Sequence, residues 1–251
     1  MINHVLIIFL ILHFFTDYYL QTDKLALDKY YQVKKFIFHV CIYFFIMVIP
    51  FIYYGFNLWY LLIGVIAGIS HFLIDGVKLF IIKKKPYLFE NICLYLIDQY
   101  LHIGFIVLGV LLFSSNQTKL LFDVTYNFTE ANIIYLRWVL LFVLIFKPAN
   151  VSFRIAFKKY KPQEVQDNKE DTQEKSNKAG AVIGNCERLL YCICFSLGQY
   201  TLLGLIITCK GFARHRDIQE KAGFAEYFLI GTFYSIVYSI TSFWLVFHII
   251  S

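Results

Sequence analysis

Apolar residues gather in seven long segments along the chain, and shorter polar stretches separate them. The segments cover residues 2–20, 36–54, 58–82, 88–113, 133–157, 186–208 and 225–250. Each is close to the roughly 20 apolar residues that an α-helix needs to cross a bilayer. The pattern therefore predicts an all-α protein, a polytopic transmembrane helical bundle of about seven spans. The first segment lacks a basic leader and a cleavage site of small residues, so we interpret it as a retained span and not as a signal peptide.

Composition excludes the soluble alternatives. Of the 251 residues, 59% are hydrophobic and 16% are charged, whereas soluble domains are about 45–50% apolar and about 25% charged. A cytosolic enzyme, a secreted disulfide scaffold and a disordered chain are all excluded. The six cysteines lie in or beside apolar segments and form no CxxC pair, so we interpret them as small buried hydrophobic residues.

The net charge of +6 is concentrated in particular loops. The first, third and fifth connections are lysine-rich, the fifth also being acidic, whereas the second has no lysine and the fourth has one. Basic loops stay in the cytoplasm, so the N-terminus is expected outside. The sixth connection is also basic, and seven simple spans would place it outside. Either segment five or six does not cross fully, or this loop folds back against the membrane. No soluble stretch is long enough for a nucleic-acid reader, so no nucleic-acid partner is expected.

The polar segments suggest four parts of the chain. Residues 1–115 form a four-helix membrane domain, and residues 116–160 hold a fifth span that is interrupted at Lys147-Pro148. Proline removes a backbone donor and kinks a helix. Residues 161–180 are predicted to be a flexible polar linker because they lack apolar periodicity. Residues 181–251 form a two-span region with a basic loop.

Ionisable side chains recur inside the first four apolar segments at one spacing. His13/Asp17, His71/Asp75 and Asp98/His102 are each four residues apart, and the second segment adds His39. Residues i and i+4 share one helix face, so each pair can direct both groups to one point. Ionisable residues inside a bilayer are costly and usually functional. The four antiparallel helices are expected to bring these side chains to one level, near the cytoplasmic leaflet.

The depth of the last pair requires a bent start to the fourth segment. Asp98 and His102 follow the Lys83–Lys85 cluster by about three to four turns, roughly 20–25 Å of straight helix. That depth is too great for a shared level with Asp75. Pro86 and the mixed sequence after it make a bend plausible.

Imidazole and carboxylate groups are the usual ligands of zinc, manganese and iron. The predicted metal ligands are His13, Asp17, His39, His71, Asp75, Asp98 and His102. Such a set can hold one ion, or two ions about 3.5–4 Å apart that activate a water for hydrolysis. The predicted catalytic residues are Asp17, Asp75 and Asp98, one of them as a general base, together with Lys78, which would pair with Asp75 or hold a phosphate. Gln21 and Gln99 are predicted to support the ligands by hydrogen bonds.

The N-terminal motifs also resemble a known family. They are His13-Phe-Phe-Thr-Asp17-Tyr-Tyr-Leu-Gln21-Thr-Asp-Lys24, His39, His71-Phe-Leu-Ile-Asp75-Gly-Val-Lys78 and Asp98-Gln99-Tyr-Leu-His102. They look like a bacterial family of polytopic membrane proteins catalogued as a domain of unknown function, family 3307. The resemblance is specific over about the first 115 residues, and the C-terminal part looks like the longer members. It implies a multi-pass protein of the inner membrane and no settled activity. The His/Asp pattern is also loosely similar to membrane-bound metal-dependent hydrolases.

Basic residues in the C-terminal part suggest a second, separate function. Lys210, Arg214 and Arg216 lie close together in the sixth connection. They are predicted to bind an anionic lipid headgroup or a phosphorylated substrate, because arginine donates two parallel bonds to phosphate. The alternative is that these residues bind no ligand and that their long side chains only place their charges at the membrane–water interface.

Three functions remain open from the sequence. The first is a metal-dependent hydrolase of phosphate esters or lipid-linked substrates. The second is an ion- or proton-coupled transporter, in which the same residues relay protons and the broken fifth segment lines the path. The third is a non-enzymatic membrane scaffold. The residues favour the first.

Overall fold

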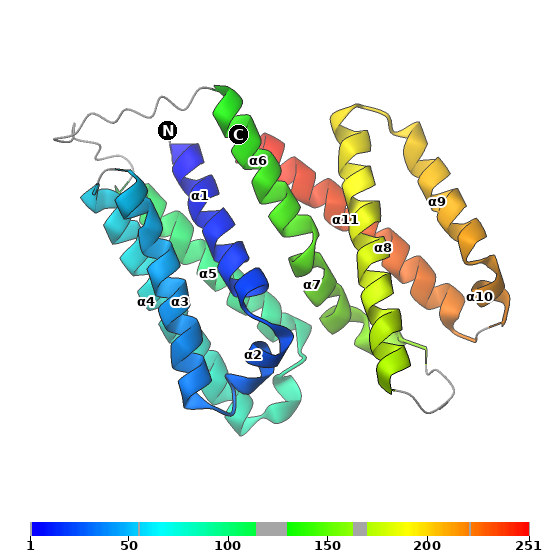
Figure 1. The fold of residues 1–251 in the computed structure, drawn as a ribbon, viewed down its shortest axis with the longest axis horizontal. Coiled ribbons are helices and arrows are strands. Elements are labelled where there is room, and N and C mark those ends of the chain that lie inside the picture. Colours follow the sequence, from blue (N-terminus) through cyan, green and yellow to red (C-terminus); the bar gives the residue numbers. More distant parts are fainter. Residues whose placement is uncertain (1, 55, 114–129, 163–169, 221, 251) are drawn as a thin grey trace. The chain divides into compact units, whose positions relative to one another are not determined.

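The structure is a computed structural model that describes residues 2–54, 56–113, 130–162, 170–220 and 222–250 (Figure 1). Helices make up the described chain, and no strand occurs in it. The predicted all-α class is confirmed. The chain divides into two compact units, one of residues 1–143 and one of residues 144–249.

The first unit is built mainly from the predicted four N-terminal segments. Its helices are α1 (Ile2–Phe14), α2 (Asp23–Asp28), α3 (Val33–Tyr53), α4 (Leu58–Lys84), α5 (Ile92–Phe113) and most of α6 (Glu130–Ile145). A π-helical turn, Phe15–Leu20, continues α1. Helix α4 packs against both α3 and α5, and α1 packs against α3 and α5. The predicted antiparallel arrangement of the first four long helices is visible in Figure 1.

Glycines allow α3 and α4 to approach closely. A Cβ on Gly64 would overlap the carbonyl oxygen of Met47, and a Cβ on Gly68 would overlap the ring of Phe44. The side chains between the helices are apolar and fully buried, as Met47 and Ile63 illustrate. This close contact fixes the register of α3 against α4, and therefore the height of the polar residues that each helix presents.

Local capping explains the bent start of α5. Helix α4 ends at Lys84, a 3₁₀ turn covers Pro86–Leu88, and α5 begins at Ile92. The Asn91 side chain accepts hydrogen bonds from the backbone N–H groups of Cys93 and Leu94, as an N-cap does. Asp98 consequently lies only six residues into α5, about 9 Å from its start. The predicted bend is confirmed.

The second unit holds the end of the fifth segment and the four helices that begin within or after the polar stretch. Its helices are α7 (Lys147–Phe157), α8 (Glu170–Ser196), α9 (Thr201–Ala213), α10 (His215–Glu220) and α11 (Phe224–Trp244), which ends in a π-helical turn, Leu245–Ile249. Helix α11 packs along α8 and contacts α7. The predicted interruption of segment five is confirmed, since α6 ends at Ile145 and α7 begins at Lys147.

Segment six is not the single helix that the apolar pattern predicts. Helix α8 ends at Ser196, and Gly198 adopts a left-handed conformation with φ of 65°. The N–H of Gln199 bonds back to the carbonyl of Cys194, which is the helix-ending geometry that glycine favours. The chain then reverses into α9, so residues 186–208 form part of a helical hairpin (Figure 1). Of the alternatives for the basic sixth loop, a segment six that does not cross fully agrees with this turn.

The predicted polar linker is partly helical. Residues 163–169 lie outside the described residues, and α8 begins at Glu170. The sequence after Glu170 is rich in Glu, Gln and Lys, which are good helix formers without any apolar face. A polar stretch of this composition can extend a helix beyond its packed part. The predicted division of the chain into four parts otherwise stays a prediction.

Five helices in the described chain are long and apolar enough to cross a membrane. They are Val33–Tyr53, Leu58–Lys84, Ile92–Phe113, Asn132–Tyr160 and Phe224–Ile249. Two shorter apolar helices, His4–Leu20 and Thr201–Ala213, account for the rest of the predicted seven. Large apolar side chains such as Phe45 and Leu111 are exposed on these helices, as expected of a lipid-facing surface. The protein is a multi-pass membrane protein.

Candidate metal centre

The predicted His/Asp residues meet at the ends of α3, α4 and α5 that adjoin the basic loops. His39 lies six residues after the start of α3, and Asp75 lies nine residues before the end of α4. These positions are about 9 and 14 Å from the helix ends, respectively. The groups therefore share one level, as their positions in the sequence predict.

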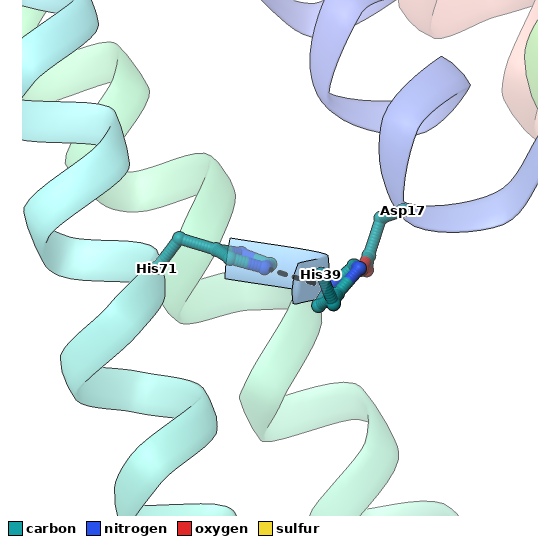
Figure 2. Close-up of side chains that lie close together, drawn as sticks. All are labelled: Asp17, His39 and His71. Atoms are coloured by element: carbon teal, nitrogen blue, oxygen red, sulfur yellow. Dashed lines mark hydrogen bonds and ion pairs between the residues drawn. The ribbon is translucent and has the colours of Figure 1, made fainter. Parts of the chain in front are cut away.

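One group of candidate ligands combines α3, α4 and the π-helical turn. Asp17, His39 and His71 offer ligand atoms that all lie within 4.8 Å of one another (Figure 2). His39 Nε2 lies 3.0 Å from His71 Nε2 and 3.4 Å from Asp17 Oδ1. Two facing Nε2 atoms can share one proton between them, or both can direct a lone pair at one cation.

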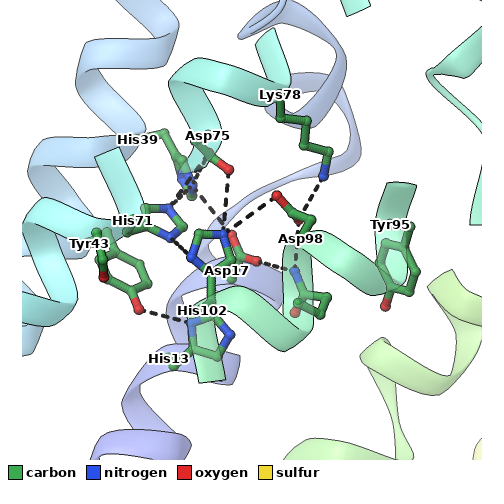
Figure 3. A network of polar contacts seen from close by, with 12 residues as sticks. His13, Asp17, His39, Tyr43, His71, Asp75, Lys78, Tyr95, Asp98 and His102 are labelled. Carbon is green, nitrogen blue, oxygen red and sulfur yellow. Dashed lines mark hydrogen bonds and ion pairs between the residues drawn. The ribbon is translucent and has the colours of Figure 1, made fainter. Parts of the chain in front are cut away.

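A second group lies beside the first and shares His71. His71, Asp75 and His102 also offer ligand atoms within 4.8 Å of one another (Figure 3). His102 Nε2 lies 3.7 Å from Asp75 Oδ1 and 3.6 Å from Asp98 Oδ1. The other oxygen of Asp75, Oδ2, lies 3.6 Å from His39 Nε2 and 3.7 Å from His71 Nε2. The Asp75 carboxylate thus borders both groups, with one oxygen toward each.

His13 is part of the buried cluster but lies outside both ligand groups. Its Nδ1 hydrogen-bonds the Tyr43 hydroxyl at 2.9 Å, and its ring centroid is 5.5 Å from that of His102. The Tyr43 ring stacks on the His71 ring at a centroid distance of 3.7 Å. Asp17 lies in the π-helical turn that follows α1, so this pair is not spaced as on a regular α-helix, and metal ligation by His13 stays a prediction. Such turns are frequent at functional sites.

Two lysines pair with the buried carboxylates. Lys78 Nζ lies 2.7 Å from Asp98 Oδ2, on the next helix, and not on Asp75 as one alternative proposed (Figure 3). Lys29 Nζ lies 2.8 Å from Asp75 Oδ2, and the Lys29 side chain is buried. Burial disfavours the charge on Lys29, but Asp75, Tyr30 and Asp17 together outweigh it and raise the pKa of Lys29 above its ordinary value.

Lys29 is the site residue that sequence reasoning missed. It lies one residue beyond α2, in the first basic loop, where lysines are expected to face water. Its side chain instead turns inward to Asp75, while the nearby Lys34 and Lys35 are exposed. In the sequence, the position of Lys29 does not distinguish it from the other lysines of the first basic loop.

The two glutamines lie where supporting residues were predicted. Gln99 Nε2 donates to Asp17 Oδ2 at 3.1 Å and to Asp98 Oδ2 at 3.2 Å, which links two of the carboxylates. Gln21 Oε1 accepts from Lys29 Nζ at 3.4 Å. Gln21 therefore contacts the lysine that pairs with Asp75.

The donor set fits a divalent cation. Zinc–nitrogen and zinc–oxygen bonds of about 2.0–2.2 Å make the ligand–ligand edges of a tetrahedral shell about 3.3–3.5 Å long. The ligand-atom separations of 3.0–3.7 Å bracket this length. Within the described chain, several buried polar atoms also lack a hydrogen-bond partner, among them His13 Nε2, His102 Nε2 and Asp98 Oδ1. Buried polar atoms without partners are costly, and an ion bound to His102 Nε2 would satisfy that atom.

Residues 5–129 match the family described as "Protein of unknown function (DUF3307)". The chain belongs to the DUF3307 family. The matched residues include every predicted metal ligand, so the candidate centre lies within the DUF3307 region. The resemblance in the N-terminal motifs is confirmed. No curated protein and no solved structure is significantly similar to this DUF3307 protein.

The predicted anionic-group site in the second unit has a different geometry. Lys210 pairs with Glu187 at 2.8 Å, Arg214 with Asp217 at 2.9 Å and Arg216 with Glu220 at 2.9 Å. Each basic group therefore has a carboxylate of its own chain. Binding of a headgroup or phosphorylated substrate by these residues stays a prediction.

Proposed function

We propose that the buried His/Asp cluster binds a divalent metal ion and hydrolyses a phosphate ester or a lipid-linked ester at the cytoplasmic face of the inner membrane. The observation that supports this most is the meeting of three imidazoles and two carboxylates, from α3, α4, α5 and the π-helical turn, at ligand-shell distances. Zinc, manganese and iron all suit these ligands. When bound, such an ion lowers the pKa of a coordinated water and supplies hydroxide near neutral pH.

The protein residues would take distinct parts in this reaction. His39, His71, Asp75 and His102 are the proposed ligands, and Asp17 is a ligand or the general base. The Asp98 carboxylate lies beside His102 and holds the Lys78 ammonium. Lys78 is the more exposed of the two buried lysines, which supports a role in meeting the negative charge of a phosphate.

The position of the cluster supports a substrate that comes from one membrane face. Its groups lie about 9–14 Å from the helix ends that adjoin the basic loops, where a headgroup or its phosphate resides. Carriers usually bind at the midplane of the bilayer.

The test is hydrolysis by the purified full-length protein in detergent. Bis-p-nitrophenyl phosphate and p-nitrophenyl phosphate are offered with Mn²⁺ or Zn²⁺, and with a chelator instead. Activity is expected only with metal, and Asp17→Asn is expected to abolish it. Asp28→Asn, which changes the charge equally but lies outside the proposed site, is expected to leave it intact. Activity that persists with the chelator would contradict the proposal.

A proton-coupled transporter is the second candidate because the imidazoles form a chain. His39, His71 and His102 are linked in sequence through Nε2–Nε2 and Nδ1–Nδ1 contacts of 3.0 and 3.3 Å. Such a chain can pass protons from ring to ring. Proton flux in proteoliposomes that disappears in His71→Gln, together with a lack of metal, would favour this function over hydrolysis.

A further inference from the structure

Lys29 and the candidate metal ion compete for the same carboxylate oxygen. The Lys29 ammonium lies 2.8 Å from Asp75 Oδ2, and the same oxygen faces His39 Nε2 at 3.6 Å and His71 Nε2 at 3.7 Å. An ion held by these two imidazoles and Asp75 Oδ2 would lie next to the ammonium. Two cations at such a distance repel each other strongly where water is excluded.

The charge balance of the cluster also indicates what the Lys29 ammonium does in the metal-free protein. Three carboxylates, Asp17, Asp75 and Asp98, face two ammonium groups, Lys29 and Lys78. One negative charge remains when the imidazoles are neutral, as they must be to serve as ligands. Without the Lys29 ammonium, a second buried carboxylate would also lack a countercharge, and burying it would be costly. The lysines therefore allow the cluster to fold without metal.

The two lysines differ in how they are attached. Lys78 lies within α4, a helix of 27 residues that is packed on both sides. Lys29 follows α2, a helix of six residues in the connection between the π-helical turn and α3. This connection contacts α3, and Tyr30, beside Lys29, packs edge-on against Phe89. A short connection can move an ammonium group at lower cost than a long packed helix can.

We infer that Lys29 is a built-in counter-cation of the metal centre: its ammonium neutralises Asp75 in the metal-free protein and leaves Asp75 when the site takes up a divalent cation. This inference rests on the proposed function. It also limits the centre to one ion, because a second ion would add charge that the remaining carboxylates cannot balance. The released ammonium lies at the face from which an anionic substrate would come.

The experiment measures Zn²⁺ affinity of the full-length protein in detergent, by competition with a chromogenic chelator. Lys29→Met keeps most of the apolar stem and removes the charge, and it is expected to bind Zn²⁺ about tenfold more tightly or better. Lys35→Met is the matched control, because Lys35 belongs to the same basic loop but is exposed. It makes the same change in net charge and is expected to bind as the wild type does.

A measurement on the wild type covers the case in which Lys29→Met does not fold. Acetic anhydride labels accessible amines, and mass spectrometry reads the extent at each lysine. Lys29 is expected to be protected without metal and several-fold more reactive with Zn²⁺, while Lys35 reacts equally in both. Equal reactivity of Lys29 with and without bound Zn²⁺ would overturn the inference.

The outcomes separate this inference from the proposed function. If the wild type binds Zn²⁺ and Lys29→Met binds it no better, the counter-cation role is wrong and the metal centre stands. If only Lys29→Met binds Zn²⁺, the lysine does neutralise Asp75, but the native protein has no metal centre. If neither binds Zn²⁺, both proposals fail.

Discussion

The two units bury polar side chains of different kinds, and the difference separates a chemical site from a structural one. The first unit buries acids, imidazoles and ammonium groups, some of whose atoms have no hydrogen-bond partner in the described chain. The second buries Arg188, which donates to Asn150 and Asn185 beside the broken helix, and Glu187, which pairs with Lys210. Imidazoles and carboxylates come together at ligand-shell distances in the first unit, and this indicates where an ion would bind.

The polar network of the second unit provides hydrogen-bond donors to the backbone carbonyls at the break between α6 and α7. Pro148 has no N–H, so the carbonyl of Leu144 lacks its usual helical partner, and the Tyr238 hydroxyl donates to it at 3.3 Å. Arg188 Nε donates to the carbonyl of Ile145, and its terminal nitrogen donates to Asn150 Oδ1 at 2.6 Å. A break at membrane depth is tolerated only where neighbouring groups satisfy the freed backbone. This network therefore has a structural role.

Removing Asp75 tests the chemical side of the comparison and has the largest expected effect. Asp75→Asn removes the carboxylate that borders both ligand groups and leaves Lys29 without its countercharge. Zn²⁺ binding is expected to weaken by more than about 100-fold, since loss of supporting groups alone costs about 10–100-fold. The free energy of unfolding is expected to fall by about 3 kcal/mol. Chelator competition and thermal unfolding in detergent measure the two effects; unchanged Zn²⁺ affinity would refute the role of Asp75.

Removing Arg188 tests the structural side. Arg188→Met removes the donor to the carbonyl of Ile145 and to the side-chain oxygen of Asn150, at about 1–3 kcal/mol for each group, whereas the Asn185 oxygen still accepts from Asn150 Nδ2. The free energy of unfolding is expected to fall by about 3 kcal/mol, while Zn²⁺ affinity stays within a factor of about two. A loss of Zn²⁺ binding in folded Arg188→Met would break the distinction between the units.

The contact between α3 and α4 sharpens the comparison, because it sets His39 against His71. Gly64→Ala is expected to lower the free energy of unfolding by about 2 kcal/mol, since its Cβ would overlap the Met47 carbonyl. Gly104→Ala is the matched control: its Cβ meets no atom within 4 Å, and alanine favours the helix by up to about 1 kcal/mol. Thermal unfolding of the two variants provides the measurement, and equal stability would show that the close approach is unimportant.

The smallest effect is expected at Gln99, which touches two carboxylates without belonging to either ligand group. Gln99→Leu removes the donor to Asp17 and Asp98, and Zn²⁺ affinity is expected to fall by about tenfold. Gln99→Glu would place a further negative charge there and is the contrasting variant. An affinity equal to that of the wild type would show that the glutamine orients neither carboxylate.

The sequence predicts the helices and the site better than it predicts the contacts within the site. Periodic His/Asp spacing in long apolar segments predicted the cluster because α-helical geometry places i and i+4 on one face. It did not predict the π-helical turn in which Asp17 lies. Nor did it predict the inward turn of Lys29, because that depends on the carboxylate it meets on another helix.

The C-terminal segments show that the length of an apolar run does not by itself predict a single transmembrane helix. Residues 186–208 are apolar enough to suggest one span, but Gly198 reverses the chain within them. A single glycine in an apolar run does not distinguish a turn from a packed helix. The reversal depends on the backbone hydrogen bonds around it, which composition does not contain.

The most direct test of the metal centre is the metal content of the purified full-length protein. Wild type and His71→Ala are purified in detergent without chelators, and zinc, manganese and iron are measured by mass spectrometry against protein concentration. His71 belongs to both ligand groups, so its loss affects any ion in the cluster. We expect the wild type to hold close to one ion per chain and His71→Ala to hold only background metal. Equal metal content in the two folded proteins would contradict a metal centre in this cluster.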